Sequence, residues 1–446
     1  MINEGIFRAY DIRGIYPSEI NEETVYLTAK AYAEWLKPKK VALGRDVRTS
    51  GESLFNEAKR GLTEMGVDVV DIGVITSDML YFAVAKYSLD GGISVTASHN
   101  EAQYNGLKVV GKNVRPISID SGLKQIEEIA KAGEFVDSEK PGRVEQKQIL
   151  EAYAKKILSF VDPSKIKPMK VVVNPNFGAA GKVVDALAGN LKLELVKLNF
   201  EEDGTFPKGK PDPSMPKDRK ETLQLIKSSG ADLGVIWDGD ADRCIFMDEK
   251  GVFVEGCYTA SILAQEILRK HPGAKMVCNA SVTLAFTETV KAAGGIPITN
   301  KVGHTFITER MIKEGAAFGS EVSGHYSFKG YWSCDNGMIP FVMMLQILSI
   351  SGKKLSELVA PIREKYPVSG DINFEVVKAQ EILHKLEENF RDGKISHIDG
   401  LSVEYPAWRF NIRASNTEPL VRLNVEAKTK EIVDEKVKEL KNIIEA

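Results

Sequence analysis

Short apolar runs alternate with amphipathic stretches along most of the chain, and the same order of elements occurs three times. Each copy predicts a strand, a helix, a second strand, a second helix and a third strand, and the third strand ends in a polar loop. The predicted strands lie at 41–44, 67–73 and 92–95 in the first copy, 170–174, 193–198 and 231–237 in the second, and 275–279, 296–299 and 316–319 in the third. This repetition predicts three α/β units in which helices cover a sheet.

The chain after about Tyr366 follows a different pattern, which predicts an α+β domain whose strands pair antiparallel. The predicted strands are 371–376, 401–405, 408–412 and 421–425, and the predicted helices are 380–389 and the charged stretch that closes the chain. The whole sequence therefore predicts four domains, at 1–145, 146–250, 251–365 and 366–446.

Composition narrows the class of protein. The 446 residues carry a net charge of −3, which offers no basic footprint for nucleic acid or an anionic membrane. The N-terminus shows no secretory signal, and the apolar run 338–350 is shorter than the ~20 residues that span a bilayer, so it predicts a buried helix. Four widely spaced cysteines indicate reduced thiols. We therefore expect a cytoplasmic protein whose partners are small molecules, without nucleic acid or membrane.

The first polar loop, Thr96–Asn100, follows a short apolar strand, and such a loop is where open α/β sheets place their ligands. Ser98 is a candidate nucleophile there. The alternative is a turn in which Ser98 and Asn100 bond their own backbone, but three repeated units with chemically different loops favour a functional role. A serine hydrolase is disfavoured because Ser98 lies in no Gly-x-Ser-x-Gly sequence.

The second polar loop carries Asp238, Asp240 and Asp242 at alternating positions, so a tight loop can direct all three carboxylates inward. Three oxygen ligands suit Mg²⁺. A calcium loop of the EF-hand type is the alternative, but Arg243 occupies the position at which that loop needs glycine. A phosphatase nucleophile at Asp238 and a solvated acidic turn stay open as further interpretations.

Other loops concentrate groups that bind phosphates and sugars. Bidentate arginines with short hydrogen-bond donors suit phosphate, acceptors and donors together suit sugar hydroxyls, and a lysine or histidine suits proton transfer. The candidates for phosphate binding are Arg413, Ser415, Asn416 and Thr417, with Arg422 nearby. The candidates for binding sugar hydroxyls are Glu321, Ser323 and His325. The candidates for proton transfer are Lys108 and His304. The segment Phe7–Gly14 adds the anion-binding side chains of Tyr10 and Arg13.

In order and spacing, these loops resemble those of the α-D-phosphohexomutase family over essentially the full chain. The matching segments are the phosphoserine loop Thr96–Asn100, the metal loop Asp238–Arg243, the sugar loop Glu321–His325 and the phosphate loop Arg413–Pro419. The resemblance implies three similar α/β/α domains with mixed sheets and a C-terminal α+β domain resembling the TATA-binding-protein fold, around a central cleft.

Within that family the chain is most similar to the phosphomannomutase/phosphoglucomutase branch. The resemblance implies interconversion of hexose 1-phosphate and hexose 6-phosphate, of mannose or glucose, through a phosphoserine at Ser98 and a hexose 1,6-bisphosphate. Mg²⁺ would be held by Asp238, Asp240, Asp242 and the phosphorylated Ser98. A phosphoglucosamine mutase and a metal-dependent phosphatase are the alternatives. The expected assembly is a monomer or a weak homodimer.

The resemblance also implies roles for single residues. Lys108 and His304 occupy the positions for proton transfer. The residues implied to steady the phosphoserine or to bind substrate are Tyr10, Arg13, His99, Arg243, Lys301, Glu321, Ser323, His325, Arg413, Ser415, Asn416, Thr417 and Arg422. Two positions depart from the family pattern: Glu101 stands where proline is common, and Ser281 lies where related enzymes often carry a basic residue.

Overall fold

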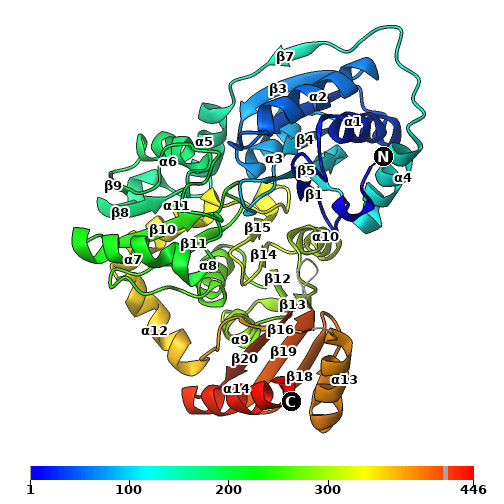
Figure 1. The fold of residues 1–446 in the computed structure, drawn as a ribbon. Helices are drawn as coiled ribbons and strands as arrows, with labels where there is room; N and C mark the ends of the chain where they lie inside the picture. Colours follow the sequence, from blue (N-terminus) through cyan, green and yellow to red (C-terminus); the bar gives the residue numbers. More distant parts are fainter. Residues whose placement is uncertain (1, 377, 415–419, 446) are drawn as a thin grey trace. The chain divides into compact units, whose positions relative to one another are not determined.

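The computed structural model describes residues 2–376, 378–414 and 420–445, and its chain forms two compact units (Figure 1). Unit 1 comprises Met1–Val252 and Cys334–Ile350, and unit 2 comprises Phe253–Ser333 and Ser351–Ala446. Each unit contains two of the four β-sheets. The four domain ranges expected from the sequence stay a prediction.

The first sheet of unit 1 has seven strands in the order β1-β5-β4-β2-β3-β7, with β6 paired to β5. Strands β4, β2, β3 and β7 run parallel, whereas β1, β5 and β6 pair antiparallel. The strands are β1 (Ile12–Ile15), β2 (Lys40–Arg45), β3 (Asp68–Val74), β4 (Gly91–Val95), β5 (Tyr104–Gly111), β6 (Arg115–Pro116) and β7 (Val144–Gln146).

Helices cover both faces of this first sheet. A β-carbon added at Gly91 would meet Tyr32 of α1, and one added at the next residue, Gly92, would meet Leu80 of α3, so α1 and α3 lie on opposite faces. Helices α2 and α4 pack with α1 over one hydrophobic core. The helices are α1 (Glu22–Leu36), α2 (Gly51–Glu64), α3 (Ser77–Lys86) and α4 (Lys124–Ala132), and the short helical turns are η1 (Glu4–Ile6), η2 (Lys112–Val114) and η3 (Ile119–Leu123).

The second sheet of unit 1 has the order β11-β10-β8-β9 and receives a helix from far along the chain. Gly234 faces Ile226 of α7, whereas Trp237 packs edge-on against Phe341 of α11, with ring centroids 5.4 Å apart. Helix α11 is mostly buried, which confirms the buried helix predicted at 338–350. The elements are α5 (Leu150–Leu158), η4 (Pro163–Lys165), β8 (Met169–Asn174), α6 (Ala180–Ala188), β9 (Leu193–Lys197), α7 (Pro216–Ser229), β10 (Leu233–Trp237), β11 (Cys244–Met247) and α11 (Met338–Ser351).

The first sheet of unit 2 has the order β13-β12-β14-β15 and is also covered on both faces. Gly319 lies under Ile307 and Met311 of α10, and its neighbour Phe318 lies 6.3 Å, between ring centroids, from Phe286 of α9. The elements are α8 (Gly256–Lys270), β12 (Lys275–Asn279), α9 (Leu284–Ala292), β13 (Ile296–Asn300), α10 (His304–Glu314), β14 (Phe318–Ser320), β15 (Tyr326–Phe328) and η5 (Lys329–Tyr331).

The second sheet of unit 2 is antiparallel throughout, in the order β16-β20-β19-β18-β17. Helices α13 and α14 lie against it and share one hydrophobic core with its strands (Figure 1). The elements are α12 (Leu355–Lys365), β16 (Ile372–Glu375), α13 (Ala379–Asn389), β17 (Lys394–Ser396), β18 (Leu401–Glu404), β19 (Trp408–Ala414), β20 (Leu420–Ala427) and α14 (Lys430–Glu445).

The fold class predicted from the sequence is confirmed, with mixed sheets in the three repeated units and an antiparallel sheet at the C-terminus. Sequence patterns missed the antiparallel strand that follows each polar loop, namely β5, β11 and β15. Strands β11 and β15 have four and three residues, all buried, and therefore show no alternation that could reveal them. The three polar loops are thus hairpin connections, at 96–103, 238–243 and 321–325.

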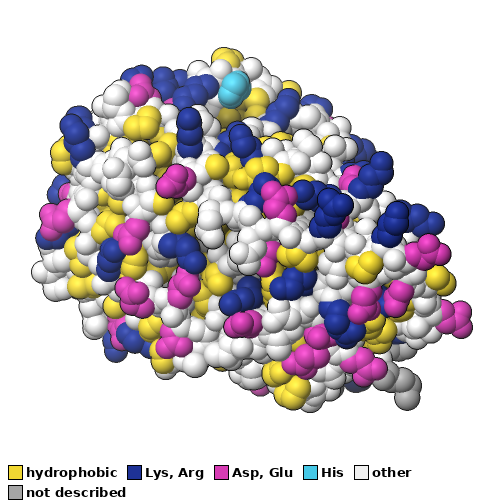
Figure 2. Space-filling model, turned by 90° about the horizontal axis from the view of Figure 1, so that it is seen from above, with side chains coloured by type: hydrophobic (Ala, Val, Ile, Leu, Met, Phe, Trp, Pro, Cys, Tyr) yellow, Lys and Arg dark blue, Asp and Glu magenta, His cyan; other side chains and the backbone are white. Residues whose placement is uncertain are grey.

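The surface carries both signs of charge. Lys and Arg side chains are interspersed with Asp and Glu side chains over the face drawn in Figure 2. Among the described residues, no single helix has the length and apolar composition needed to cross a membrane. The cysteines Cys244, Cys257, Cys278 and Cys334 are buried and carry reduced thiols.

Candidate active site

Ser98 lies in the hairpin loop between β4 and β5 and is almost completely buried, at 3% exposure. Its backbone has a φ of 53°, in the left-handed region that a non-glycine residue rarely adopts. Its N–H donates to the Thr96 hydroxyl at 2.9 Å. This unusual conformation is held in place by its neighbours, as is common at functional sites.

The Ser98 hydroxyl faces a neutral imidazole. Ser98 Oγ lies 3.1 Å from His99 Nδ1, and Arg243 Nη2 lies 3.0 Å from the same nitrogen. Because a guanidinium can only donate, Nδ1 is the acceptor. Burial, followed by the positive charge of Arg243, holds the pKa of His99 well below its usual value. The arrangement therefore links the serine loop to the metal loop through one neutral ring.

Three carboxylates form the centre of the metal loop. Asp238, Asp240 and Asp242 are at most 1% exposed, and one oxygen of each lies within 4.8 Å of an oxygen of the others. Among the described residues, Asp240 Oδ1 has no hydrogen-bond partner although it is buried. Burial, with the charges of Asp242 and Asp240, raises the pKa of Asp238 well above its usual value. Three buried carboxylates that lie this close together fit a divalent cation with a preference for oxygen.

Lys108 forms ion pairs with two of these three carboxylates. Strand β5 pairs Lys108 with Ser94 of β4, which brings its side chain to the metal loop. Its Nζ donates to Asp240 Oδ2 at 2.5 Å and also to Asp242. Burial would lower the pKa of Lys108, but attraction to Asp240 and Asp242 outweighs burial and raises the pKa above its usual value. The predicted proton-transfer residue is therefore part of a buried ion-pair network.

The N-terminal segment contacts the serine loop through Arg13. Arg13 Nη1 donates to Asn100 Oδ1 at 2.5 Å, and Arg13 Nη2 pairs with Asp11. Tyr10 is half-buried. Burial, the largest influence on the pKa of Arg13, acts to lower it, but the charges of Asp11 and Tyr10 together raise that pKa above its usual value. Unit 1 therefore brings Ser98, His99, Lys108, Arg13 and the metal loop together.

Within unit 2, the structure brings the sugar loop beside His304. Glu321 Oε1 accepts from the Gly303 N–H at 2.7 Å, at the start of helix α10. The sugar-loop hydroxyl of Ser323 lies 2.8 Å from His325 Nδ1. The rings of His304 and His325 stack, with centroids 5.5 Å apart. The pair therefore presents imidazoles next to a hydroxyl and a carboxylate.

Three further basic residues, Lys301, Arg413 and Arg422, are among the predicted substrate-binding residues. Lys301 Nζ lies 3.4 Å from the centre of the Phe306 ring. Arg413 at the end of β19 lies directly opposite Arg422 of β20. Two guanidinium groups carried at facing positions of neighbouring strands are suited to binding a phosphate. Ser415, Asn416 and Thr417, which the sequence also predicts here, lie outside the described residues.

The two departures from the family pattern have structural counterparts. The Glu101 carbonyl accepts from Arg48 Nη1 at 2.5 Å, so the backbone at this position is held without proline. At the other position, Arg409 Nη2 donates to the Ala280 carbonyl at 2.9 Å and Nη1 donates to the Ser281 carbonyl at 3.4 Å. Arg409 also pairs with buried Glu426. A basic group therefore reaches the 280–281 segment from strand β19.

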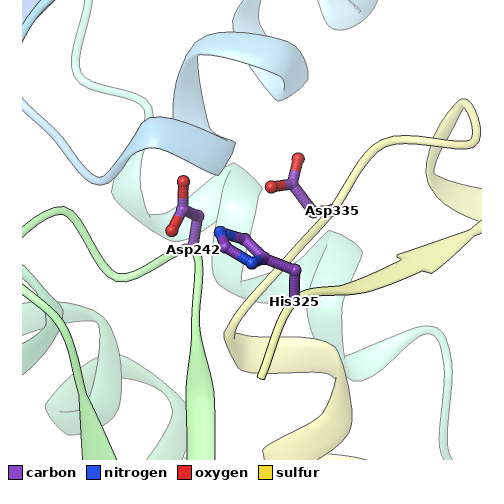
Figure 3. A group of neighbouring side chains, drawn as sticks. All are labelled: Asp242, His325 and Asp335. Atoms are coloured by element: carbon purple, nitrogen blue, oxygen red, sulfur yellow. The ribbon is translucent and has the colours of Figure 1, made fainter. Parts of the chain in front are cut away.

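Sequence patterns missed two charged residues close to the site. Asp335 is fully buried, and one of its carboxylate oxygens lies within 4.8 Å of an oxygen of Asp242 (Figure 3). Arg48 is 1% exposed and donates to the Ser98 carbonyl. Asp335 lies ten residues beyond the polar loop 320–325 and does not directly follow a predicted strand. The polar run 45–50, which does follow a predicted strand, was a usable signal for Arg48.

The chain matches known protein families and curated proteins over most of its length. Models of the phosphoglucomutase/phosphomannomutase family match the chain in order: alpha/beta/alpha domain I at residues 4–137, domain II at 151–251, domain III at 255–366 and the C-terminal domain at 372–443. A phosphomannomutase of Vibrio cholerae is 42% identical over 452 residues, covering 98% of each chain. A phosphomannomutase of Escherichia coli K12 is 42% identical over 431 residues, covering 95% of this chain and 94% of that one.

A solved structure shows the same fold. The crystal structure of a phosphoglucomutase/phosphomannomutase family protein from Burkholderia thailandensis has a TM-score of 0.89 at 28% identity, covering 100% of this chain and 98% of that chain. The family matches, the relatives and the fold together define a phosphohexomutase, a mutase enzyme that acts on sugar phosphates. Within that class, the chain belongs to the phosphoglucomutase/phosphomannomutase family.

Proposed function

We propose that this phosphohexomutase interconverts the 1-phosphates and 6-phosphates of mannose and glucose, with Ser98 as the phosphoryl carrier. The observation that carries the proposal is the buried Ser98 hydroxyl, held in a left-handed backbone conformation beside His99 and the metal loop. The phosphomannomutases of Vibrio cholerae and Escherichia coli support the choice of sugars. A phosphoglucosamine mutase is not favoured by these relatives.

The proposed cycle has two phosphoryl transfers. A hydroxyl of the bound hexose monophosphate attacks phosphorus of phospho-Ser98; the new O–P bond forms as the Ser98 O–P bond breaks, and the hydroxyl proton passes to a base. The resulting intermediate, a hexose 1,6-bisphosphate, reorients in the site so that its other phosphate faces Ser98. Ser98 Oγ then attacks the other phosphorus, and the released sugar oxygen takes up a proton. Hexose and phosphoryl are conserved, and the isomeric monophosphate leaves.

The metal loop provides the proposed cation site. Asp238, Asp240 and Asp242 would hold Mg²⁺, since their buried oxygens lie together and are only partly compensated by Lys108. When bound, Mg²⁺ neutralises charge on the transferring phosphoryl group. Arg243 donates its backbone N–H to Asp238 Oδ1 at 3.2 Å and so orients that carboxylate.

The remaining predicted residues receive proposed roles from their chemistry. Lys108 and His304 would exchange protons with the reacting sugar oxygens. Arg413, Arg422 and Lys301 would bind the phosphate that is not being transferred, together with Ser415, Asn416 and Thr417. Glu321, Ser323 and His325 would bind sugar hydroxyls, and Tyr10 and Arg13 would steady the phosphoserine. We further propose a monomer or weak homodimer with no nucleic-acid or membrane partner.

The test is a mutase assay on glucose 1-phosphate and mannose 1-phosphate with Mg²⁺ and a trace of glucose 1,6-bisphosphate. Ser98→Ala removes the phosphoryl acceptor and should lower kcat by more than about 10³-fold. Ser228→Ala, on an exposed helical surface, is the matched control and should keep kcat. Release of inorganic phosphate that survives in Ser98→Ala and is lost in Asp238→Asn would contradict the proposal and indicate a phosphatase.

A further inference from the structure

Arg48 is a buried cation in the polar loop after β2, and the proposed catalytic cycle does not use it. A guanidinium has five N–H groups, and in Arg48 all of them have acceptors. Nε donates to Asp46 Oδ2 at 3.1 Å; Nη1 donates to the carbonyls of Glu101 at 2.5 Å and Tyr104 at 3.0 Å; Nη2 donates to those of Ser98 at 2.9 Å and Asn100 at 2.7 Å. One side chain therefore binds four backbone carbonyls of the hairpin that carries Ser98, between β4 and β5.

The same side chain supports the unusual backbone of Ser98. A residue at φ 53° keeps this conformation only where its surroundings hold it. Arg48 holds the Ser98 carbonyl, and its partner Asp46 accepts from the Thr96 hydroxyl at 2.6 Å. That hydroxyl in turn accepts the Ser98 N–H at 2.9 Å. Both peptide groups of Ser98 are thus tied to the Arg48–Asp46 pair.

Arg48 also reaches the metal loop through an aromatic ring. Its guanidinium carbon lies 4.9 Å from the centre of the Phe206 ring, a cation–π distance. A β-carbon added at Gly239 would lie 3.5 Å from Phe206 Cζ and 2.8 Å from the Ser98 carbonyl oxygen. The serine loop, Phe206 and the metal loop therefore pack around the guanidinium.

We propose that Arg48 is a positioning residue for phosphoryl transfer, which holds Ser98 Oγ in line with the phosphoryl group and keeps the serine loop in register with the metal loop. This proposal rests on the proposed function of Ser98 as the phosphoryl carrier. Lysine offers three donors in place of five and no planar face. Arg48→Lys therefore leaves at least two of these five acceptors without a donor and loosens the hold on the Ser98 backbone.

The experiment compares Arg48→Lys with Arg60→Lys, which makes the same replacement at an exposed arginine paired with Glu57 and Glu64. We expect kcat for glucose 1-phosphate to fall about 100-fold in Arg48→Lys, because small misplacements of a reacting atom have effects of that size. KM should stay within about threefold, since the sugar contacts are unchanged. Phosphorylation of Ser98 by hexose 1,6-bisphosphate, followed by intact mass, should slow by the same factor as kcat.

The outcomes separate positioning from folding. Unchanged kcat in Arg48→Lys, or a rise in KM that accounts for the whole loss, overturns the proposal. If Arg48→Lys does not fold, Asp46→Asn provides the test. Its amide NH2 group would face the Arg48 Nε and Thr96 hydroxyl donors, while its amide oxygen would still accept from the Arg48 backbone N–H. Retained kcat in that variant also overturns the proposal. Activity in Ser98→Ala would refute the proposed function itself, whatever Arg48 does.

Discussion

Lys108 is the residue whose replacement tests the charge balance of the metal loop most directly. Its side chain is 8% exposed and bridges two carboxylates, each 1% exposed. Lys108→Met keeps most of the side-chain volume and removes the charge. The variant then leaves Asp240 and Asp242 buried without their cation, and breaking a buried pair in this way destabilises by roughly 3–5 kcal/mol.

The expected shift in melting temperature follows from that energy. At about 2 °C per kcal/mol for a unit of this size, Lys108→Met should melt roughly 6–10 °C below the wild type in EDTA. Lys112→Met is the matched control, since Lys112 is 60% exposed and lies 3.5 Å from Asp90, and its melting temperature should change little.

Magnesium should reverse most of the loss. A cation present at about 100 times its Kd adds roughly 2.7 kcal/mol of stability. In the wild type the cation must displace the Lys108 ammonium group from both carboxylates, whereas in the variant that ammonium group is gone. The rise in melting temperature on adding Mg²⁺, measured by differential scanning calorimetry, should therefore be larger in Lys108→Met. Equal melting temperatures in EDTA, or a smaller rise in the variant, would refute this reasoning.

Two further predictions concern buried carboxylates elsewhere in the chain. Burial raises the pKa of Asp78 to about 7, helped by Asp242 and Asp335 and opposed by the hydroxyls of Thr76 and Tyr153. The folded protein then keeps a proton that the unfolded chain has released above about pH 4, so the free energy of unfolding falls as pH rises toward 7. In urea unfolding, Asp78→Asn should lose less unfolding free energy than the wild type between pH 5 and 7.5. An equal loss in the two proteins would contradict this prediction. Glu426 accepts from the Thr283 and Leu284 N–H groups at 2.8 and 2.7 Å and pairs with Arg409. Glu426→Gln should lose about 3 kcal/mol of unfolding free energy, while Glu404→Gln, at an exposed pair, should lose almost none.

Local patterns in the sequence were sufficient for the repeated architecture. Apolar strands such as 170–174 and 231–237 appear in the structure as β8 and β10, because a run of buried β-branched residues bounded by polar loops is a local signal. The antiparallel return strand β15 escaped prediction because its three residues are all buried. Its existence depends on pairing with β14, which is a contact between strands and not a property of the segment.

The candidate site divides in the same way. Ser98, the three aspartates and the sugar loop could be found from the sequence because each lies in a compact polar segment directly after a strand. The partners of these groups come from distant positions: Arg48 bonds a carbonyl 50 residues away, and Lys108 meets Asp240 across 132 residues.

By itself, then, the sequence determined the order of the repeated strands and helices, the chemistry of each loop and the family. The tertiary structure decided which charges neutralise one another, since Lys108 reaches the metal loop only where β5 pairs with β4. It also decided how Ser98 is held. The backbone of Ser98 has a positive φ, and its carbonyl accepts from the buried guanidinium of Arg48, which the sheet topology places beside the loop. Charges interact through space, and their positions in space follow from strand order.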